Sequence, residues 1–286
     1  EQYGADAYTR GLQVYTSMDL KEQEVATKAL RKGLLDFDRR QAWRGPEAYI
    51  ELPTDPKQVD IMIAEALEEH PDSDTLRAVV VTRAEPKLVL ASLQSGEQIE
   101  VGPEGLKAVG KALTDQASPK HQIRRGAVIR VEQGSDGQWV VRQLPEVEGA
   151  FVSMDPRTGL IRAMVGGFDF ERNKFNHVIQ AWRQPGSSFK PFIYSAALEK
   201  GFTPATVVND APLFYNAGST GSRAWEPKNY DGKFDGPMPL KTALAKSKNM
   251  VSIRILRSIG PAYAQDWIAR FGFETEKHPA FLTMAL

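Results

Sequence analysis

The sequence predicts an α+β protein in which helix-rich segments flank a small all-β domain. Two amphipathic segments with helical spacing come first, and short runs of β-forming residues fill the middle. A hairpin and further helices follow. Because the hydrophobic period changes near residues 74 and 147, we expect three parts, residues 1–74, 75–147 and 148–286.

The first part carries two helix signals. Ser17 and Asp19 close a β-rich stretch, and either side chain can cap the segment 21–37, whose apolar residues recur at helical spacing. A loop with Gly-Pro follows, and a second amphipathic segment covers 57–70. We expect both segments to be helices that bury one face.

Residues 75–147 predict a small barrel or sandwich, with an OB-like domain as the interpretation. Short β-rich runs alternate with turn signals, and 127–145 predicts a hairpin around GSDG at 134–137. OB folds often bind nucleic acid through several stacking aromatic rings, yet Trp139 is the only large aromatic residue in this part. Lys plus Arg and Asp plus Glu are each 36, so the chain has no basic excess either. We expect no nucleic-acid partner.

Composition excludes several kinds of chemistry. The chain has no cysteine, which removes thiol nucleophiles, disulfides and thiolate metal sites. The four histidines are scattered without metal-binding spacing: His70, His121, His177 and His278. We expect neither a metal nor a cofactor. No apolar run approaches the roughly 20 residues of a membrane span, and the first residues do not resemble a signal peptide.

The stretch RQPGSSFKPFIYSAALEKG, residues 183–201, predicts a tight turn followed by an apolar helix. Pro191 lacks an N–H and is tolerated only in the first helical turn, so it fixes the helix start close to Ser187. Lys190 follows Ser187 by one helical turn, on the same face. Two interpretations stay open here, a serine-capped helix with a solvated lysine, or a nucleophile beside its base.

A helix start would favour nucleophilic chemistry at Ser187. Unpaired N–H groups and the positive end of the helix dipole would stabilise negative charge that develops there. If Lys190 is desolvated, its pKa falls and the neutral amine can accept the hydroxyl proton. Ser-x-x-Lys alone is expected about once by chance in a chain of this length, so the motif needs independent support.

A second motif, Ser247-Lys248-Asn249, interrupts the helical segment 241–256. A hydroxyl and a carboxamide two positions apart can relay a proton and hydrogen-bond an amide substrate. The alternative for Ser247 and Asn249 is a local turn or a helix cap, and the residues alone leave it open.

Together, the two motifs resemble the transpeptidase domain of the class A penicillin-binding proteins, the bifunctional peptidoglycan synthases. The flanking residues RQPG before Ser187 and PFIY after Lys190 carry the same resemblance. Further similar segments are YTSMDLKEQEVATKAL with RGP, FVSMDPRTGLIRAMVGG, NDAPLFYN and WEPKNYDGKFDGPMPLKTALAKSKN. The resemblance covers essentially the whole chain.

The resemblance implies an identity for each part. Residues 1–74 would be the linker region between a glycosyltransferase and a transpeptidase module, and 75–147 the OB-like domain of the 1A-type members. Residues 148–286 would be the N-terminal part of a penicillin-binding, serine β-lactamase-like transpeptidase domain, an antiparallel sheet flanked by helices. The family's third motif, Lys-Thr-Gly, does not occur in the chain. We therefore expect an internal fragment whose third motif lies in the remainder of the same protein.

The resemblance also assigns roles to individual residues. Ser187 would be the acylated nucleophile and Lys190 its general base. Ser247 would relay a proton to the leaving amine, and Asn249 would hydrogen-bond the substrate amide. Three more residues lie where the family lines its cleft, with plain surface packing as the alternative: Trp225, Asn229 and Tyr230.

The implied activity is D,D-transpeptidation, which cross-links peptidoglycan stem peptides ending in D-Ala-D-Ala and is covalently inhibited by β-lactams. The implied location is the periplasmic face of the bacterial inner membrane, with the anchor outside this chain and an outer-membrane or periplasmic activator as a further candidate partner. The alternatives are a D-Ala carboxypeptidase or β-lactamase on the same scaffold, or a non-catalytic penicillin-binding sensor or scaffold.

Overall fold

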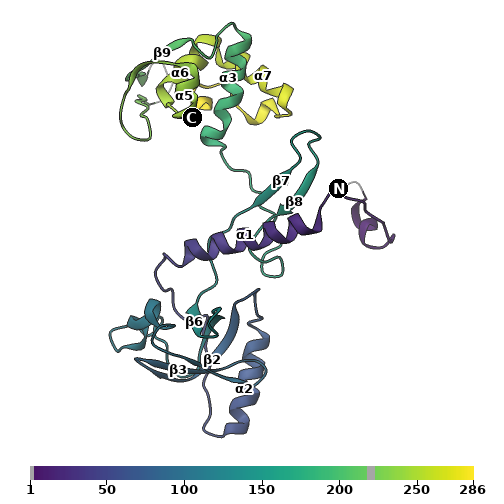
Figure 1. Cartoon of the computed structure of the whole chain (residues 1–286), viewed down its shortest axis with the longest axis vertical. Helices are drawn as coiled ribbons and strands as arrows, with labels where there is room; N and C mark the ends of the chain where they lie inside the picture. Colours follow the sequence, from purple (N-terminus) through teal and green to yellow (C-terminus); the bar gives the residue numbers. More distant parts are fainter. Residues whose placement is uncertain (1–2, 218–222) are drawn as a thin grey trace. The chain divides into compact units, whose positions relative to one another are not determined.

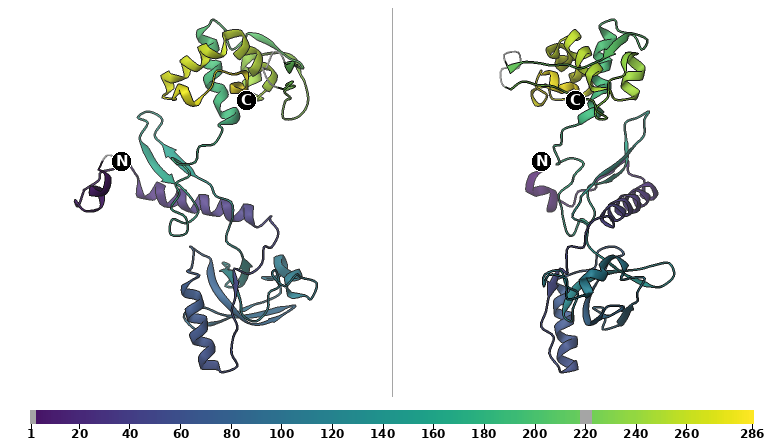
Figure 2. Two further views of the ribbon diagram at one scale, coloured as in Figure 1. Left: turned by 180° about the vertical axis from the view of Figure 1, so that it is seen from behind. Right: turned by 90° about the vertical axis from the view of Figure 1, so that its left-hand side faces the viewer.

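The structure is a computed structural model that describes residues 3–217 and 223–286. The chain forms two compact units, residues 1–182 and 183–286, and each unit has hydrophobic clusters of its own. Figures 1 and 2 show the helices and strands of both units.

Six strands form one antiparallel sheet in the first unit, in the order β1-β5-β2-β3-β4 with β6 also paired to β5. Their bounds are β1 (Ala48–Tyr49), β2 (Arg77–Glu85), β3 (Leu88–Ser92), β4 (Gln98–Val101), β5 (Ala127–Gln133) and β6 (Trp139–Arg142). The hairpin that the sequence predicts around residues 134–137 is the β5–β6 pair.

Both faces of this sheet are covered. In β2, Val79 and Val81 join a cluster that includes the short 3₁₀ helix η2 (Lys107–Leu113), whereas Ala78 and Val80 join a cluster with helix α2 (Pro56–Glu68). Figure 1 shows α2 beside the sheet. Because both faces are buried there, residues 78–81 of β2 are a continuous apolar run without alternation. Strand β1 and helix α2 precede residue 75, so the sheet uses residues that the sequence assigned to the linker region.

The first unit also pairs helix α1 (Leu20–Asp38) with a hairpin of β7 (Phe151–Met154) and β8 (Ile161–Val165). Of the two capping candidates in the sequence, Ser17 and Asp19, the Asp19 carboxylate caps α1 by accepting hydrogen bonds from the N–H groups of Lys21 (3.0 Å) and Glu22 (3.1 Å). Ala26 of α1 is buried against Ala163 and Val165 of β8. A short 3₁₀ helix, η1 (Gly4–Tyr8), precedes α1.

Polar bonds join the start of α1 to β8 as well. The Gln23 side chain both donates to the Met164 carbonyl (3.0 Å) and accepts from the Met164 N–H (2.9 Å), so it pairs with the strand as a backbone would. The Asp19 N–H donates to the Arg162 carbonyl at 2.9 Å, and the Ser17 hydroxyl donates to the Ile161 carbonyl at 2.6 Å. Residues 17–23 are therefore bonded along the length of β8.

The second unit is mostly helical. Its elements are η3 (Gly186–Phe189), α3 (Lys190–Glu199), β9 (Val207–Asp210), β10 (Gly236–Pro239), α5 (Leu240–Ala245), α6 (Asn249–Ile259), α7 (Pro261–Ile268), η4 (Ala269–Phe271), η5 (Thr275–Lys277) and η6 (Leu282–Ala285). Strands β9 and β10 pair antiparallel. The core of this unit packs α3 against α6, and the buried Ala196 and Ala197 of α3 allow the helices to approach closely. This packing brings residue 190 near residues 247–249.

Candidate active site

The helix that carries Ser187 and Lys190 begins where Pro191 predicts. The 3₁₀ turn η3 leads directly into α3, with Pro191 in the first α-helical turn. Gly186 supplies the positive φ of 55° that the turn before Ser187 requires. Residues three apart align in 3₁₀ geometry, so Ser187 and Lys190 lie on one face of the helix start. Ser187 is exposed, whereas Lys190 is 1% exposed.

The Lys190 ammonium binds the second motif. Its Nζ donates to the Ser247 carbonyl at 2.8 Å, to Ser247 Oγ at 3.0 Å and to Asn249 Oδ1 at 2.7 Å. These three contacts connect segments that are almost 60 residues apart in the chain. The residue spacing within either motif does not indicate that the two motifs lie next to each other. The packing of α3 on α6 brings them into contact.

The environment of Lys190 makes it more available as a base near neutral pH than an ordinary lysine, because more of it is unprotonated. Burial lowers the pKa of Lys190 to about 8, because the charged amine has left water. Its three hydrogen-bond partners in the described part of the chain are neutral oxygens, and none is a carboxylate. A useful fraction of Lys190 is therefore neutral near physiological pH.

Ser247 occupies an unusual backbone conformation. It has φ 54° and follows helix α5 as the left-handed residue of a Schellman motif. The Ser247 N–H donates to the Leu244 carbonyl (3.0 Å), and the Lys248 N–H donates to the Ala243 carbonyl (2.9 Å). Glycine usually fills this position, so a serine here stores backbone strain, a feature that clusters at functional sites. The conformation presents both the carbonyl and the hydroxyl of Ser247 to Lys190.

Asn249 is the first residue of α6, and Asn229 holds it there. The Asn229 Oδ1 accepts from the N–H groups of Asn249 (2.8 Å) and Met250 (3.4 Å), so a residue distant in sequence caps the helix. The Asn249 side chain donates to the Lys228 carbonyl (2.8 Å) while its Oδ1 accepts from Lys190. Asn229 is buried, and this geometry favours a positioning role for it over contact with a substrate.

The other two cleft residues inferred from the sequence lie apart from Lys190's contacts. Trp225 is half-buried, stacks on Tyr215 with ring centroids 5.4 Å apart, and packs against the hydrophobic core of the unit. The Tyr230 side chain is fully exposed. A role for either residue in substrate binding stays a prediction.

The structure adds two residues that the sequence did not single out. Lys248, inside the second motif, and Asp210, at the end of β9, are both buried and interact with each other. The sequence offered only a weak signal for them, because a lysine between Ser247 and Asn249 has the pattern of a solvated charge.

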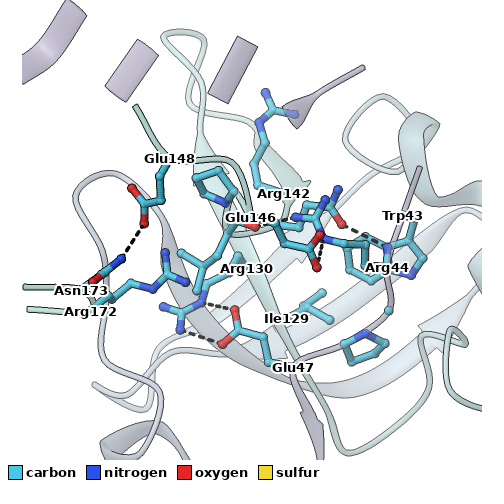
Figure 3. Close-up of a pocket in the computed structure, with 15 residues that line it drawn as sticks. Trp43, Arg44, Glu47, Ile129, Arg130, Arg142, Glu146, Glu148, Arg172 and Asn173 are labelled. Atoms are coloured by element: carbon cyan, nitrogen blue, oxygen red, sulfur yellow. Dashed lines mark hydrogen bonds and ion pairs between the residues drawn. The ribbon is translucent and has the colours of Figure 1, made fainter. Parts of the chain in front are cut away.

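A pocket of about 630 Å³ lies elsewhere, in the first unit (Figure 3). Charged residues line it, and several are already paired: Arg130 binds both Glu47 oxygens (2.7 and 2.8 Å), and Arg44 binds Asp38 (3.0 Å). No residue of the two motifs lines it. A large concave pocket is the usual first choice for an active site, but this one offers mutually neutralised ion pairs and no nucleophile with a base.

Two family models match the chain. The penicillin-binding protein OB-like domain matches residues 43–147, a range that includes β1 and α2, and the penicillin binding protein transpeptidase domain matches residues 149–281. Across its whole length, the chain is 47% identical to penicillin-binding protein 1A of Neisseria meningitidis serogroup A and 38% identical to that of Pseudomonas aeruginosa. A crystal structure of penicillin-binding protein 1A from Haemophilus influenzae covers 96% of the chain, with a TM-score of 0.84 and 33% identity.

The chain belongs to the penicillin-binding protein family. The comparisons confirm the α+β class, the OB-like domain and the transpeptidase fold that the sequence predicts. The chain spans 36% of the length of the Neisseria relative, 35% of the Pseudomonas relative and 39% of the Haemophilus chain. Over residues 3–217 and 223–286, no helix is both long enough and apolar enough to cross a bilayer.

Proposed function

We propose that this chain of the penicillin-binding protein family supplies the nucleophile and base of a serine-type D-Ala-D-Ala transpeptidase that cross-links peptidoglycan. The observation that carries the proposal is the contact of the buried Lys190 ammonium with both Ser247 and Asn249. The match to the transpeptidase domain model supports the same reaction class. β-Lactams imitate the D-Ala-D-Ala amide and would acylate Ser187.

The reaction proceeds by acyl transfer through a covalent intermediate. Neutral Lys190 takes the hydroxyl proton as Ser187 Oγ attacks the carbonyl carbon between the two terminal D-alanines. The helix start at Ser187 stabilises the oxyanion of the tetrahedral intermediate. The leaving amine then receives a proton through Ser247, the C–N bond breaks, and the last D-Ala departs. The amine of a neighbouring stem peptide attacks the acyl-enzyme, forms the cross-link and returns Ser187 to its hydroxyl form.

The hydrogen bonds of Lys190 support this route for the proton. Two of its three partners, the Ser247 carbonyl and Asn249 Oδ1, can only accept hydrogen bonds. Once Lys190 has taken the Ser187 proton, its ammonium donates to all three oxygens, and the Ser247 hydroxyl is the one of these three partners that can also pass a proton on. Ser247 Oγ, at 3.0 Å, can therefore exchange a proton with Lys190, which supports its role as the relay.

The remaining components belong to the proposal for the whole protein. The remainder of the same protein would supply the Lys-Thr-Gly motif and further strands, and a glycosyltransferase module would add the second activity. Phe151, Val152 and Met154 of β7 are exposed, which supports a sheet that further strands complete. We place the protein at the periplasmic face of the inner membrane, where an outer-membrane or periplasmic activator is a candidate partner.

Labelling of the intact protein with a fluorescent penicillin tests the nucleophile. We expect the wild type to be labelled and Ser187→Ala to show no label. Ser188→Ala is the matched control, because Ser188 is the adjacent exposed serine, and it should keep the label. Labelling that survives in Ser187→Ala would mean that another residue is the nucleophile.

Product analysis with purified peptidoglycan precursor separates the proposal from its alternatives. A transpeptidase yields dimeric muropeptides, whereas a D-Ala carboxypeptidase releases D-Ala without dimers. Rapid turnover of a chromogenic β-lactam would indicate a β-lactamase. A non-catalytic sensor or scaffold would be acylated by penicillin and form no cross-links.

A further inference from the structure

We propose that Lys248, through its ion pair with the buried carboxylate of Asp210, is a positioning residue that holds the turn Ser247–Asn249 against Lys190. The proposal rests on the proposed function, in which this turn sets the environment of the base.

Lys248 is anchored on carboxylates while its two neighbours in the motif contact Lys190. Its Nζ lies 3.1 Å from Asp235 Oδ2 and 3.4 Å from both Asp210 Oδ2 and Asp231 Oδ2. Burial alone would lower the pKa of Lys248, but the hydrogen bonds to these carboxylates hold the pKa above its ordinary value. Lys248 is 3% exposed, so this is a buried charge fixed in place by its partners.

Asp210 is also connected to the turn through hydrogen bonds of Asn229. It is 1% exposed and accepts from the Asn229 side-chain amide at 2.8 and 3.1 Å and from the Asp235 N–H at 2.9 Å. Asn229 in turn accepts from the Asn249 N–H. One buried carboxylate therefore holds residue 248 by its ammonium and residue 249 by its backbone.

The backbone of Lys248 is fixed toward α3 as well. Its carbonyl accepts from the Ser252 N–H (3.2 Å) and from Ser252 Oγ (2.9 Å). Ser252 Oγ also contacts the Tyr194 hydroxyl at 3.3 Å, and Tyr194 lies one helical turn after Lys190 on α3. Residue 248 is thus held through its side chain and through its carbonyl.

The turn needs such tethers because Ser247 is strained. A serine at φ 54° persists only where its surroundings hold it, and the residue directly after it is Lys248. If the ammonium anchor is removed, the turn can relax to an ordinary conformation, and the two oxygens of Ser247 then leave Lys190. Water replaces them, and the lysine recovers an ordinary environment.

The effect on Lys190 has a definite sign. The groups that meet Lys190 Nζ from α6 and from the turn are the neutral side chains of Asn249 and Ser247, and burial is the cause of its lowered pKa. Entry of water would therefore raise the pKa of Lys190 from about 8 toward the ordinary value of 10.5. Each increase of one unit in the pKa of Lys190 lowers the fraction of Lys190 that is neutral at pH 7 by about tenfold.

The main experiment measures the acylation rate of the intact protein by penicillin between about pH 6 and about pH 10. We expect the wild-type rate to rise with a midpoint near pH 8 and the midpoint of Lys248→Met to move upward by about one unit or more, with a loss of about tenfold or more at pH 7. Lys246→Met is the matched control, because exposed Lys246 binds the same Asp235 at 3.1 Å. It should match the wild type.

A double variant separates tethering from charge balance and covers the case in which Lys248→Met fails to fold. In Lys248→Met with Asp210→Asn, no buried carboxylate is left without its cation, so folding should be restored. We expect the midpoint to stay high, because the ammonium tether is still absent. A return of both midpoint and rate to wild-type values would show that Lys248 only neutralises Asp210, and the proposal would be wrong.

Competitive acetylation of lysines, followed by peptide mass spectrometry, measures the pKa of Lys190 without any acylation of Ser187. A rise in the pKa of Lys190 in Lys248→Met supports the positioning role of Lys248, whether or not penicillin labels the wild type. Absence of labelling in the wild type would refute only the proposed function. An unchanged pKa and an unchanged midpoint in a protein that is acylated would refute only the positioning role.

Discussion

Replacing Lys190 by methionine should stabilise the second unit near neutral pH while abolishing acylation. Methionine has a similar length and no charge, so the change removes the cost of burying an ammonium. The substitution also removes the hydrogen bonds from Lys190 to Ser247, which is exposed, and to Asn249, which is half-buried. Water can replace the ammonium at these oxygens because neither residue is fully buried.

The size of the effect follows from the pKa of Lys190, which burial lowers from 10.5 to about 8. At about 1.4 kcal/mol per unit, the buried charge costs about 3 kcal/mol at pH 7. Between pH 8 and pH 10.5, the unfolded chain binds the proton that the folded chain has released, so wild-type stability rises with pH in this window. The cost is complete below pH 8, falls to about 1 kcal/mol at pH 10 and vanishes above pH 10.5.

Urea unfolding of wild type and Lys190→Met at about pH 7 and about pH 10 measures this cost. Trp267 is a reporter for the second unit, because it donates to Ser195 Oγ of α3 at 3.1 Å, and a Trp267→Phe control identifies its fluorescence signal. We expect the stability of the variant relative to the wild type to be greater by about 2 kcal/mol at the lower pH. Comparing the two pH values cancels the pH-independent cost of removing the hydrogen bonds.

The reasoning fails if the difference between the two proteins is the same at both pH values. Lys190 would then have an ordinary pKa in the folded protein, and it would be a poor base at neutral pH. Penicillin labelling that survives in Lys190→Met would contradict its role in proton removal independently.

Three further substitutions test other parts of the structure. Ser247→Gly should raise the free energy of unfolding by about 0.5–1 kcal/mol, because glycine adopts φ 54° without strain, and should slow acylation by at least about tenfold, because the hydroxyl is removed. A gain in stability by Ser247→Ala as well would argue against strain as the cause. Asn229→Ala should destabilise the second unit by about 2–4 kcal/mol, because it leaves the N–H groups at the start of α6 uncapped and removes the amide that donates to the buried Asp210. A urea midpoint close to wild type would refute this capping role. Asp19→Ala should lower the free energy of unfolding by about 1 kcal/mol through loss of the α1 cap. Asp19→Asn should retain most of the wild-type stability, because asparagine can also cap a helix.

The sequence predicted best those features that one residue type determines locally. Pro191 predicted the start of the helix after Ser187, and Gly201, with φ 90°, ends α3 as a helix-terminating glycine should. Hydrophobic spacing predicted a helix at 57–70, which the structure places at Pro56–Glu68. Spacing did not reveal that this helix covers the sheet, because periodicity shows that a face is buried but not its partner.

The contacts that build the candidate site could not be predicted from local sequence. Ser247 lies in a conformation that sequence rules reserve for glycine, so no residue signal marks its turn. Asn229 caps a helix that begins 20 residues later, and local capping rules cover only adjacent positions. Lysines such as Lys248 are usually found on the surface, and only the fold places carboxylates around this one. The residue patterns alone did not show that the two motifs belong to one site. That expectation came from the family resemblance.

The side-chain amide of Gln23, which pairs with Met164 as a strand would, has a mechanical consequence. Together with the bonds from Ser17 and Asp19, it attaches the start of α1 to β8 along the strand rather than at a single point. A pull on the chain just before α1 would therefore be shared among several bonds loaded in parallel, which resist shear better than bonds that open one at a time. Helix α1 and the β7–β8 hairpin should therefore move together as one rigid body, and bending should be confined to the segments outside residues 17–38 and 151–165.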